Sequence, residues 1–487
     1  MNMIEKDKQY LIGVDMGSTG IKAAALCGGR IAASARRPMV YHENQNICEY
    51  DAELYYQTIA DLIREITGHM PKDTVCAGIA AVCASGNTLL VKNGKPLTPV
   101  FSWRDHRGGS DLEAFFGHVT EEQIHQSVGW HKVPQFPLAQ LCWLKRNTPE
   151  LLTEADMICE GSCYINYRLC GHWYMDYSTA TTFYLQDQRT LHWNPKTLEV
   201  LGIPEYKLPK LVPVGTQIGV LTEEAAKETG LPAGTPVIAG CYDGAAAARS
   251  VGLLEEHQLL ISCGTSWVCL YPSKNRKQLL DLGVMIDPYL TEYDLWLGMT
   301  SLGESSVYVD QVLDQLLPKD ENRPARFSSL SARSVPGAHG LLINPMRLEQ
   351  SGDLSVYTAE DICRAVMEGI VYSVKRQLLT LPHNGSPLEI RQITMAGGPS
   401  NSQIWPQIVS DIMETPVQVM FSSAACAVGA AMIAGIGAGI FTDIRDAHSC
   451  IREEPRVYTP AASSAAIYRQ GFLRFQNQFP GPDKNMH

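Results

Sequence analysis

The sequence predicts an α/β protein built from two similar halves, and two observations support this expectation. Predicted strands and helices alternate through both halves of the 487 residues, which is typical of α/β folds. A pattern of strand, glycine, two hydroxyl residues and strand also occurs twice, at residues 11–22 and 259–268, about half the chain apart. Such self-similarity indicates duplicated architecture. The chain is too long for one core, so its length favours two or three domains, and the repeat leads us to expect two, residues 1–250 and 251–487.

The elements of the first half follow from hydrophobic spacing and turn residues. Strands joined by tight turns are expected at the start, and the next segment has apolar residues at helical spacing after Asp51, a good helix N-cap. The predicted strands cover residues 10–35, 75–82 and 236–239, and the predicted helices cover residues 52–66, 121–126 and 138–146. The second half repeats this order, with strands over residues 258–271, 283–287, 295–299 and 390–395, and helices over residues 359–381, 403–413 and 426–438.

Composition excludes several classes of protein. The net charge of −11 disfavours nucleic acid as the main partner, which would need a basic face. The 14 cysteines and 13 histidines show no metal-ligand spacing, so we expect reduced thiols in a cytoplasmic protein. Residues 1–8 lack the apolar core of a signal peptide. Residues 424–441 carry no charge but are mostly Ala and Gly, so we expect a closely packed helix and no membrane span.

The first copy of the repeated pattern predicts a phosphate-binding hairpin. Gly17, Ser18 and Thr19 offer backbone N–H groups and hydroxyls to a phosphate, and Asp15 at the strand end is placed for Mg²⁺. Lys22 could reach a phosphate oxygen or face solvent. An ordinary Gly-Ser hairpin remains the alternative for the loop as a whole.

The second copy supports the phosphate interpretation. Gly264, Thr265 and Ser266 repeat the small and hydroxyl residues between two strands. Two similar halves that each open with such a hairpin suggest a nucleotide held between two domains.

Over about residues 10–440 the chain resembles the actin-like ATPase superfamily and, within it, the xylulokinase-like FGGY carbohydrate kinases. The resemblance implies two ribonuclease-H-like domains with the active site in the cleft between them. The tail from Thr442 matches weakly and is expected to be a surface extension.

Asp243 is the candidate catalytic residue. It ends an apolar strand and precedes Ala-rich sequence, where a carboxylate could accept a proton from a substrate hydroxyl or cap the helix. In the FGGY family a Gly-x-x-Asp turn at this place carries the catalytic base. The residue after it is Gly244, where the family often has a side chain.

The adenosine element is expected at Gly397, Gly398 and Asn401, because this turn and the following helix through Trp405 resemble the family's nucleotide-binding segment. The chain departs from the family shortly afterwards, where Cys426 stands in a region that often holds an acidic residue.

Two segments are candidates for sugar binding. Trp103, Arg104 and Asp105 resemble the family's Trp-x-Asp-x-Arg segment, in which the Trp could stack on a carbon chain and Asp105 could accept hydroxyls while Arg107 holds it. Ser85 and Asn87 lie where xylulokinase-like members carry Gln-Met-His-Gly. An exposed charged turn is the alternative for the first segment.

The resemblance therefore implies a kinase that transfers the γ-phosphoryl group of ATP, with Mg²⁺, to a hydroxyl of a ketose, a pentulose such as xylulose being preferred. Polyols such as glycerol or erythritol are the alternative substrates, although residues 85–87 lack the Arg-Glu pair of glycerol kinases. A non-catalytic actin-like ATP-binding protein is the alternative from another class. The expected partner is a small sugar, with no nucleic acid or membrane, and homodimers are common in the family.

Overall fold

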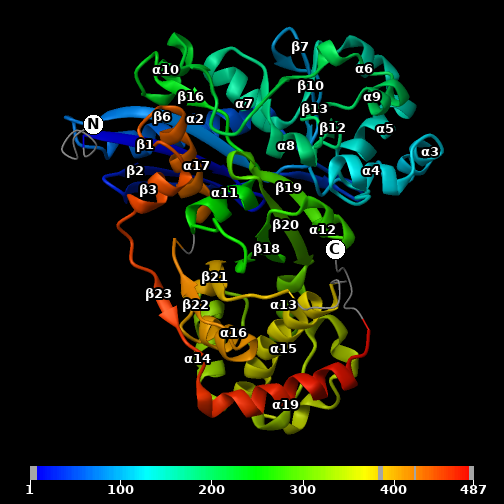
Figure 1. Cartoon of the computed structure of the whole chain (residues 1–487), viewed down its shortest axis with the longest axis vertical. Helices are drawn as coiled ribbons and strands as arrows, with labels where there is room; N and C mark the ends of the chain where they lie inside the picture. The colour runs from blue at the N-terminus through cyan, green and yellow to red at the C-terminus, as the bar shows by residue number, and fades with distance from the viewer. Residues whose placement is uncertain (1–7, 382–387, 422–423, 482–487) are drawn as a thin grey trace. The chain divides into compact units, whose positions relative to one another are not determined.

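The computed structural model describes residues 8–381, 388–421 and 424–481, and it divides into two compact units (Figure 1). The first unit comprises Met1–Gly252, Met285–Trp296 and Ala424–Glu453, and the second comprises Leu253–Val284, Leu297–Ser423 and Glu454–His487. Both units are therefore discontinuous in sequence. Residues 1–7, on which the expectation about a signal peptide rests, lie outside the described residues.

A six-stranded sheet organises the first unit. Its strands lie in the order β15-β16-β6-β1-β2-β3. They are β1 (Gln9–Met16), β2 (Gly20–Cys27), β3 (Arg30–Pro38), β6 (Val75–Cys83), β15 (Gln217–Val220) and β16 (Pro236–Ile238). The first three form the antiparallel meander predicted from the sequence, while β6 and β16 run parallel to β1.

The second unit repeats this arrangement. Its strands follow the order β20-β18-β17-β21-β22-β23, with β21 and β22 parallel to β17 and β23 antiparallel at the edge. They are β17 (Gln258–Cys263), β18 (Trp267–Ser273), β20 (Leu295–Leu302), β21 (Gln392–Gly397), β22 (Val417–Val419) and β23 (Arg456–Tyr458). In each unit a meander is followed by two parallel strands and an antiparallel edge strand. The repeated hairpin in the sequence is thus the opening of a repeated sheet, and the α/β expectation is confirmed.

Shorter strands surround the first sheet. They are β4 (His42–Asn44), β5 (Ile47–Tyr50), β7 (Leu89–Lys92), β8 (Lys95–Pro96), β9 (Val100–Phe101), β10 (Met157–Cys159), β11 (Tyr174–Asp176), β12 (Gln186–Asp187), β13 (His192–Trp193) and β14 (Lys210–Val212). Strand β19 (Met285–Leu290) instead pairs with β20 and is the end strand of the other sheet, which has seven strands. The helices of the first unit are α2 (Ala52–Gly68), α3 (Leu112–Phe116), α4 (Glu121–Val128), α5 (Pro137–Asn147), α6 (Pro149–Glu154), α7 (Gly161–Cys170), α8 (Tyr177–Thr182), α9 (Pro195–Leu201), α10 (Glu223–Thr229), α11 (Asp243–Ser250), α17 (Ala425–Gly437) and α18 (Ile444–Ser449). Those of the second unit are α12 (Arg276–Asp281), α13 (Ser305–Leu313), α14 (Arg323–Arg333), α15 (Ala359–Thr380), α16 (Ile404–Met413) and α19 (Ala462–Gln478).

Two helices of the first unit show how the sequence specifies this fold. The predicted cap of α2 is confirmed, since the Asp51 carboxylate accepts hydrogen bonds from the N–H groups of Glu53 and Leu54. The small-residue helix α17 lies directly on β1 (Figure 1). A Cβ atom at Gly13 would lie 1.9 Å from the Ala427 carbonyl oxygen, so only glycine permits this approach. Within the described residues, no helix has the length and apolar character required to cross a membrane.

The prediction that the tail from Thr442 is a surface extension was wrong. Strand β23 completes the second sheet by pairing with β22, and α19 buries Tyr468, Phe472 and Phe475. These aromatic residues recur at i, i+4 and i+7, a helical stripe that was visible in the sequence. Because these side chains are buried, the segment belongs to the core of its unit, although its sequence matches the family weakly.

Candidate functional site

Three of the predicted segments meet at one edge of the first sheet. Met16 at the end of β1 lies opposite Cys83 at the end of β6, and Cys83 forms an isolated parallel bridge with Tyr242. The Ala84 N–H donates to the Met16 carbonyl at 2.9 Å. The hairpin after β1, the loop after β6 and Asp243 therefore share the carboxyl edge of parallel strands, where ligands bind in α/β folds.

The first hairpin joins a buried acid to a partly exposed lysine. Asp15 is buried at the end of β1, and the Lys22 ammonium nitrogen lies 3.5 Å from its Oδ2. Burial raises the pKa of Asp15, and the positive charge of Lys22 opposes that rise. Its other oxygen, Oδ1, is buried without a hydrogen-bond partner. A buried carboxylate oxygen with no donor is a suitable ligand for Mg²⁺ or one of its waters.

The Gly17–Thr19 turn is held by backbone contacts. The Tyr41 hydroxyl donates to the Ser18 carbonyl at 2.9 Å, and the Met39 N–H donates to the Thr19 carbonyl at 3.3 Å. Gly17 and Ser18 are partly exposed, and Thr19 is exposed. The Ser18 and Thr19 carbonyls are therefore engaged by protein, and the amide and hydroxyl groups of the turn are the candidate donors for a phosphate.

Asp243 is the first residue of α11, and the helix N-cap is Tyr242. The Asp243 carboxylate accepts from the N–H of Gly244 at 2.7 Å and does not cap the helix. Burial raises the pKa of this carboxyl to about 7, with a further rise from the negative charge of Asp15. A carboxylate whose pKa lies near the working pH is suited to general base catalysis.

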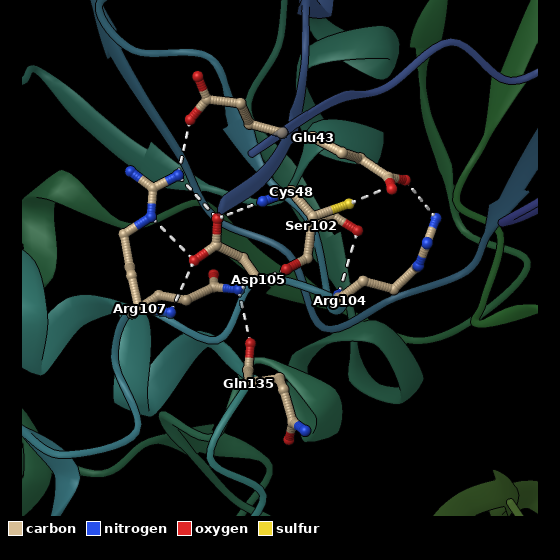
Figure 2. A network of polar contacts seen from close by, with 9 residues as sticks. Glu43, Cys48, Ser102, Arg104, Asp105, Arg107 and Gln135 are labelled. Atoms are coloured by element: carbon tan, nitrogen blue, oxygen red, sulfur yellow. Dashed lines mark hydrogen bonds and ion pairs between the residues drawn. The ribbon is translucent and has the colours of Figure 1, made fainter. Parts of the chain in front are cut away.

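The Trp103–Arg107 segment forms a buried network around Asp105 (Figure 2). Asp105 is 0% exposed, and its Oδ2 accepts from the Cys48 N–H at 2.9 Å and from Arg107 Nη2 at 2.7 Å. Its Oδ1 accepts from the Arg107 N–H at 3.1 Å and from Arg107 Nε at 2.8 Å. Four protein donors occupy the roughly four acceptor positions of a carboxylate. This geometry indicates that Asp105 anchors the loop at residues 103–107.

Arg104 and Trp103 of this segment lie outside the hydrogen bonds to Asp105. Arg104 forms an ion pair with Glu43 at 2.9 Å, and its guanidinium lies 5.2 Å from the Tyr41 ring centre. Trp103 is partly exposed and lines a small cavity in the first unit. Trp103 is thus the residue of the segment that borders this cavity.

The loop after β6 forms part of the same cavity. Asn87 lines it, although its side chain is largely engaged, with Oδ1 accepting from the Gly161 N–H at 2.7 Å and Nδ2 donating to the Ala84 carbonyl at 3.3 Å. Ser85 is partly exposed and is not among the residues that line the cavity. The lining residues are Met16, Gly17, Met39, Tyr41, Tyr50, Tyr55, Cys83, Ala84, Asn87, Ser102, Trp103 and Ser162.

The second unit brings its two predicted nucleotide elements to one sheet edge. Cys263, before the Gly264–Ser266 turn, lies opposite Gly397 on the parallel strand β21. Gly397 has φ +94°, and a Cβ atom there would lie 2.1 Å from the Cys263 carbonyl oxygen, so glycine is required. Gly398 faces open space, and Asn401 and Thr265 are exposed. The Ser306 hydroxyl donates to the Gly264 carbonyl at 2.6 Å and steadies the turn.

Sequence reasoning missed the aromatic wall of the cavity. Tyr41, Tyr50 and Tyr55 come from a loop, a short strand and a helix, with ring centres 5.9 Å apart for the first two and 4.9 Å for the last two. No motif joins these residues, and only their ring contacts with one another and their shared place in the cavity lining reveal them. Glu160, which contacts the loop after β6, was also missed.

Comparison with known proteins identifies the family. The model of the FGGY family of carbohydrate kinases, N-terminal domain, matches residues 10–250, and that of the C-terminal domain matches residues 259–438. The chain belongs to the FGGY family of carbohydrate kinases. It is thus a phosphotransferase that uses ATP as donor and an alcohol group as acceptor.

Individual FGGY relatives differ in the substrate that their names give. L-fuculokinase of Escherichia coli strain K12 is 27% identical over 93% of this chain and 98% of its own length. Gluconokinase of Bacillus subtilis strain 168 is 23% identical over 94% and 93%. The crystal structure of xylulose kinase from Rhodospirillum rubrum superposes with a TM-score of 0.83 at 23% identity, covering 96% of this chain and 98% of that one. The fold is therefore the two-domain actin-like ATPase fold, and these likenesses leave the sugar open.

Proposed function

We propose that this FGGY kinase phosphorylates a neutral ketose, with a pentulose such as xylulose preferred over polyols, and that Asp243 is its general base. The observation that carries the proposal is the shared sheet edge of Asp243, the Asp15 hairpin and the cavity-lining loop after β6. Phosphoryl transfer to an alcohol requires acceptance of the hydroxyl proton and neutralisation of phosphate charge, and this edge offers groups for both.

The remaining predicted residues have complementary roles in this proposal. Asp15, whose Oδ1 has no hydrogen-bond partner, would hold Mg²⁺, which supplies charge neutralisation on the phosphates. Gly17–Thr19 with Lys22, and Gly264–Ser266, would bind phosphate oxygens. Gly397, Gly398 and Asn401 would bind adenosine, where exposed backbone permits the approach of a flat base.

The character of the cavity favours a neutral acceptor. Every described residue that lines it has an uncharged side chain, and aromatic or methionine side chains make up half of them. Sugar carbon faces pack well against such rings, whereas a carboxylate would enter without a compensating cation. A buried unpaired charge costs several kcal/mol, which corresponds to a hundredfold or greater loss of affinity.

We therefore expect discrimination between neutral ketoses and aldonates. With saturating MgATP, kcat/KM for xylulose or fuculose should exceed that for gluconate by about 100-fold or more. Initial rates of ADP release measure this ratio. Equal or better use of gluconate would contradict the neutral cavity while leaving the kinase activity itself intact.

The raised pKa of Asp243 predicts that kcat/KM begins to fall at an unusually high pH on the acid side of its pH profile. Because the folded protein retains this proton up to pH about 7, the base is lost as pH falls through 7, far above the range of an ordinary aspartate. At low concentrations of both substrates, kcat/KM should be half-maximal near pH 7 and should fall about tenfold per unit below pH 6. A flat profile down to pH 5 would contradict the assignment of Asp243 as base.

A further inference from the structure

The loop at residues 84–87, which contributes Ala84 and Asn87 to the cavity lining, is hydrogen-bonded to two consecutive residues, Glu160 and Gly161. The Gly86 N–H donates to Glu160 Oε1 at 2.8 Å, and the Gly161 N–H donates to Asn87 Oδ1 at 2.7 Å. Asn87 in turn donates to the Ala84 carbonyl at 3.3 Å. Glu160 and Gly161 therefore hold the Gly86–Asn87 end of this loop through two hydrogen bonds, and the Asn87 side chain ties that end to Ala84.

Glu160 is an unusual residue for such a contact. It is 0% exposed, and its described partners are the Gly86 N–H, the Thr182 hydroxyl at 3.3 Å and the Cys83 sulfur at 3.6 Å, none of which carries positive charge. Burial raises the pKa of Glu160 to about 8, and the charge of Asp176 adds to the rise. The Cys83 thiol donates to Oε2, whereas the Gly86 N–H and the Thr182 hydroxyl donate to Oε1.

The titratable groups around Glu160 change protonation state at pH values other than that of Glu160. They come from β5, β6, β10, α7 and the N-cap of α8, and they are Tyr50, Cys83, Cys159, Cys163 and Asp176. Burial raises the pKa of the tyrosine and of the three thiols well above their usual values, so these groups are neutral at moderate pH. Asp176 has a pKa raised to about 6 and is ionised before Glu160 is.

We propose that Glu160 is a positioning residue that fixes the acceptor-binding loop and so sets the affinity for the sugar without touching it. The inference rests on the proposed function, because it takes the cavity as the acceptor site. Below pH 8 a neutral acid accepts the Gly86 hydrogen bond. Above pH 8 an ionised carboxylate without a cation is costly to bury, so it turns toward water and Gly86 loses its acceptor.

The test compares sugar KM, ATP KM and kcat at pH 7 and pH 9 in the wild type, Glu160→Gln and Glu160→Leu. For the wild type, the fraction of neutral Glu160 falls about tenfold between pH 7 and pH 9, so sugar KM should rise up to about tenfold while ATP KM stays within about threefold. Glu160→Gln keeps an oxygen acceptor and cannot ionise. Its sugar KM should match that of the wild type at pH 7 within about threefold and stay flat to pH 9.

Glu160→Leu removes the acceptor and should raise sugar KM about tenfold or more at both pH values, with a smaller change in ATP KM. Asp287→Asn, which alters another buried carboxyl of the same unit, is the control and should keep the alkaline rise of the wild type. The proposal is overturned if Glu160→Gln retains that rise, or if Glu160→Leu changes ATP KM as much as sugar KM. If Glu160→Leu does not fold, the pH profile of Glu160→Gln decides.

Amide hydrogen exchange separates this proposal from the proposed function. At a fixed pH of 7, the peptide that contains Gly86 should exchange faster in Glu160→Leu than in the wild type, and at the wild-type rate in Glu160→Gln. If no sugar is phosphorylated by any variant, the neutral-ketose proposal fails, and this exchange pattern still tests the contact. Unchanged exchange in Glu160→Leu would show that Glu160 does not hold the loop.

Discussion

Asp243→Ala is expected to lower kcat for sugar phosphorylation by about 10³-fold while ATP binding changes less than about threefold. The carboxylate lies at the sheet edge shared with the Asp15 hairpin, and its pKa near 7 suits proton acceptance. We propose that Asp243 acts on the acceptor hydroxyl, whereas the predicted adenosine groups are Gly397 and Gly398 on β21, so the substitution is expected to change ATP affinity little. Steady-state kinetics and calorimetric ATP binding measure the two effects.

Asp243→Asn gives a sharper version of this test because it preserves size and removes the base. Asp287→Asn is the matched control, since Asp287 is also buried in the first unit with a pKa raised to about 7. The control should stay within about tenfold of the wild type. Wild-type turnover in Asp243→Asn would exclude Asp243 as the base.

Asp105→Ala is expected to lower the free energy of unfolding of the first unit by about 3 kcal/mol. The guanidinium of Arg107 lies 4.0 Å from the Phe101 ring centre, and the substitution leaves it, among the described residues, with Glu49 at 2.6 Å as its ionic partner. It also leaves the buried Cys48 N–H without an acceptor. Urea unfolding followed by tryptophan fluorescence measures the loss.

Arg104→Ala is the control for Asp105→Ala. Its ion pair with Glu43 is substantially exposed, and such surface pairs contribute at most about 1 kcal/mol. If Asp105→Ala kept wild-type stability and instead raised sugar KM, Asp105 would be a substrate contact, as the sequence motif suggested, and the anchoring role would be wrong.

Local patterns predicted much of the fold. The meander β1–β3, the Asp51 cap and the small-residue helix α17 all follow from turn residues, helical spacing and side-chain size within short windows of sequence. The tail was mispredicted because the expectation rested on its weak likeness to the family, and the helical stripe of aromatic residues in α19 was not considered. Strand β23 is short, and its role depends on pairing with β22, which no local pattern shows.

The part of the candidate site that lies at the ends of strands was predictable from the sequence. Asp15, Asp243 and the loop after β6 end neighbouring parallel strands, so topology alone brings them together. The aromatic wall and Glu160 were not predictable, because their contacts with the loops join residues far apart in the chain. The roles assigned to individual site residues stay predictions, and the network around Asp105 shows why a motif does not fix a role: four protein donors already occupy its carboxylate.

The most direct measurement of the central claim is coupled ADP release by the wild-type protein across matched ketoses, aldoses and polyols, with MgATP held constant. We expect turnover that depends on a neutral ketose, is highest with a pentulose such as xylulose, and disappears in Asp243→Asn. Hydrolysis of ATP that is independent of any sugar and unchanged in Asp243→Asn would contradict this expectation.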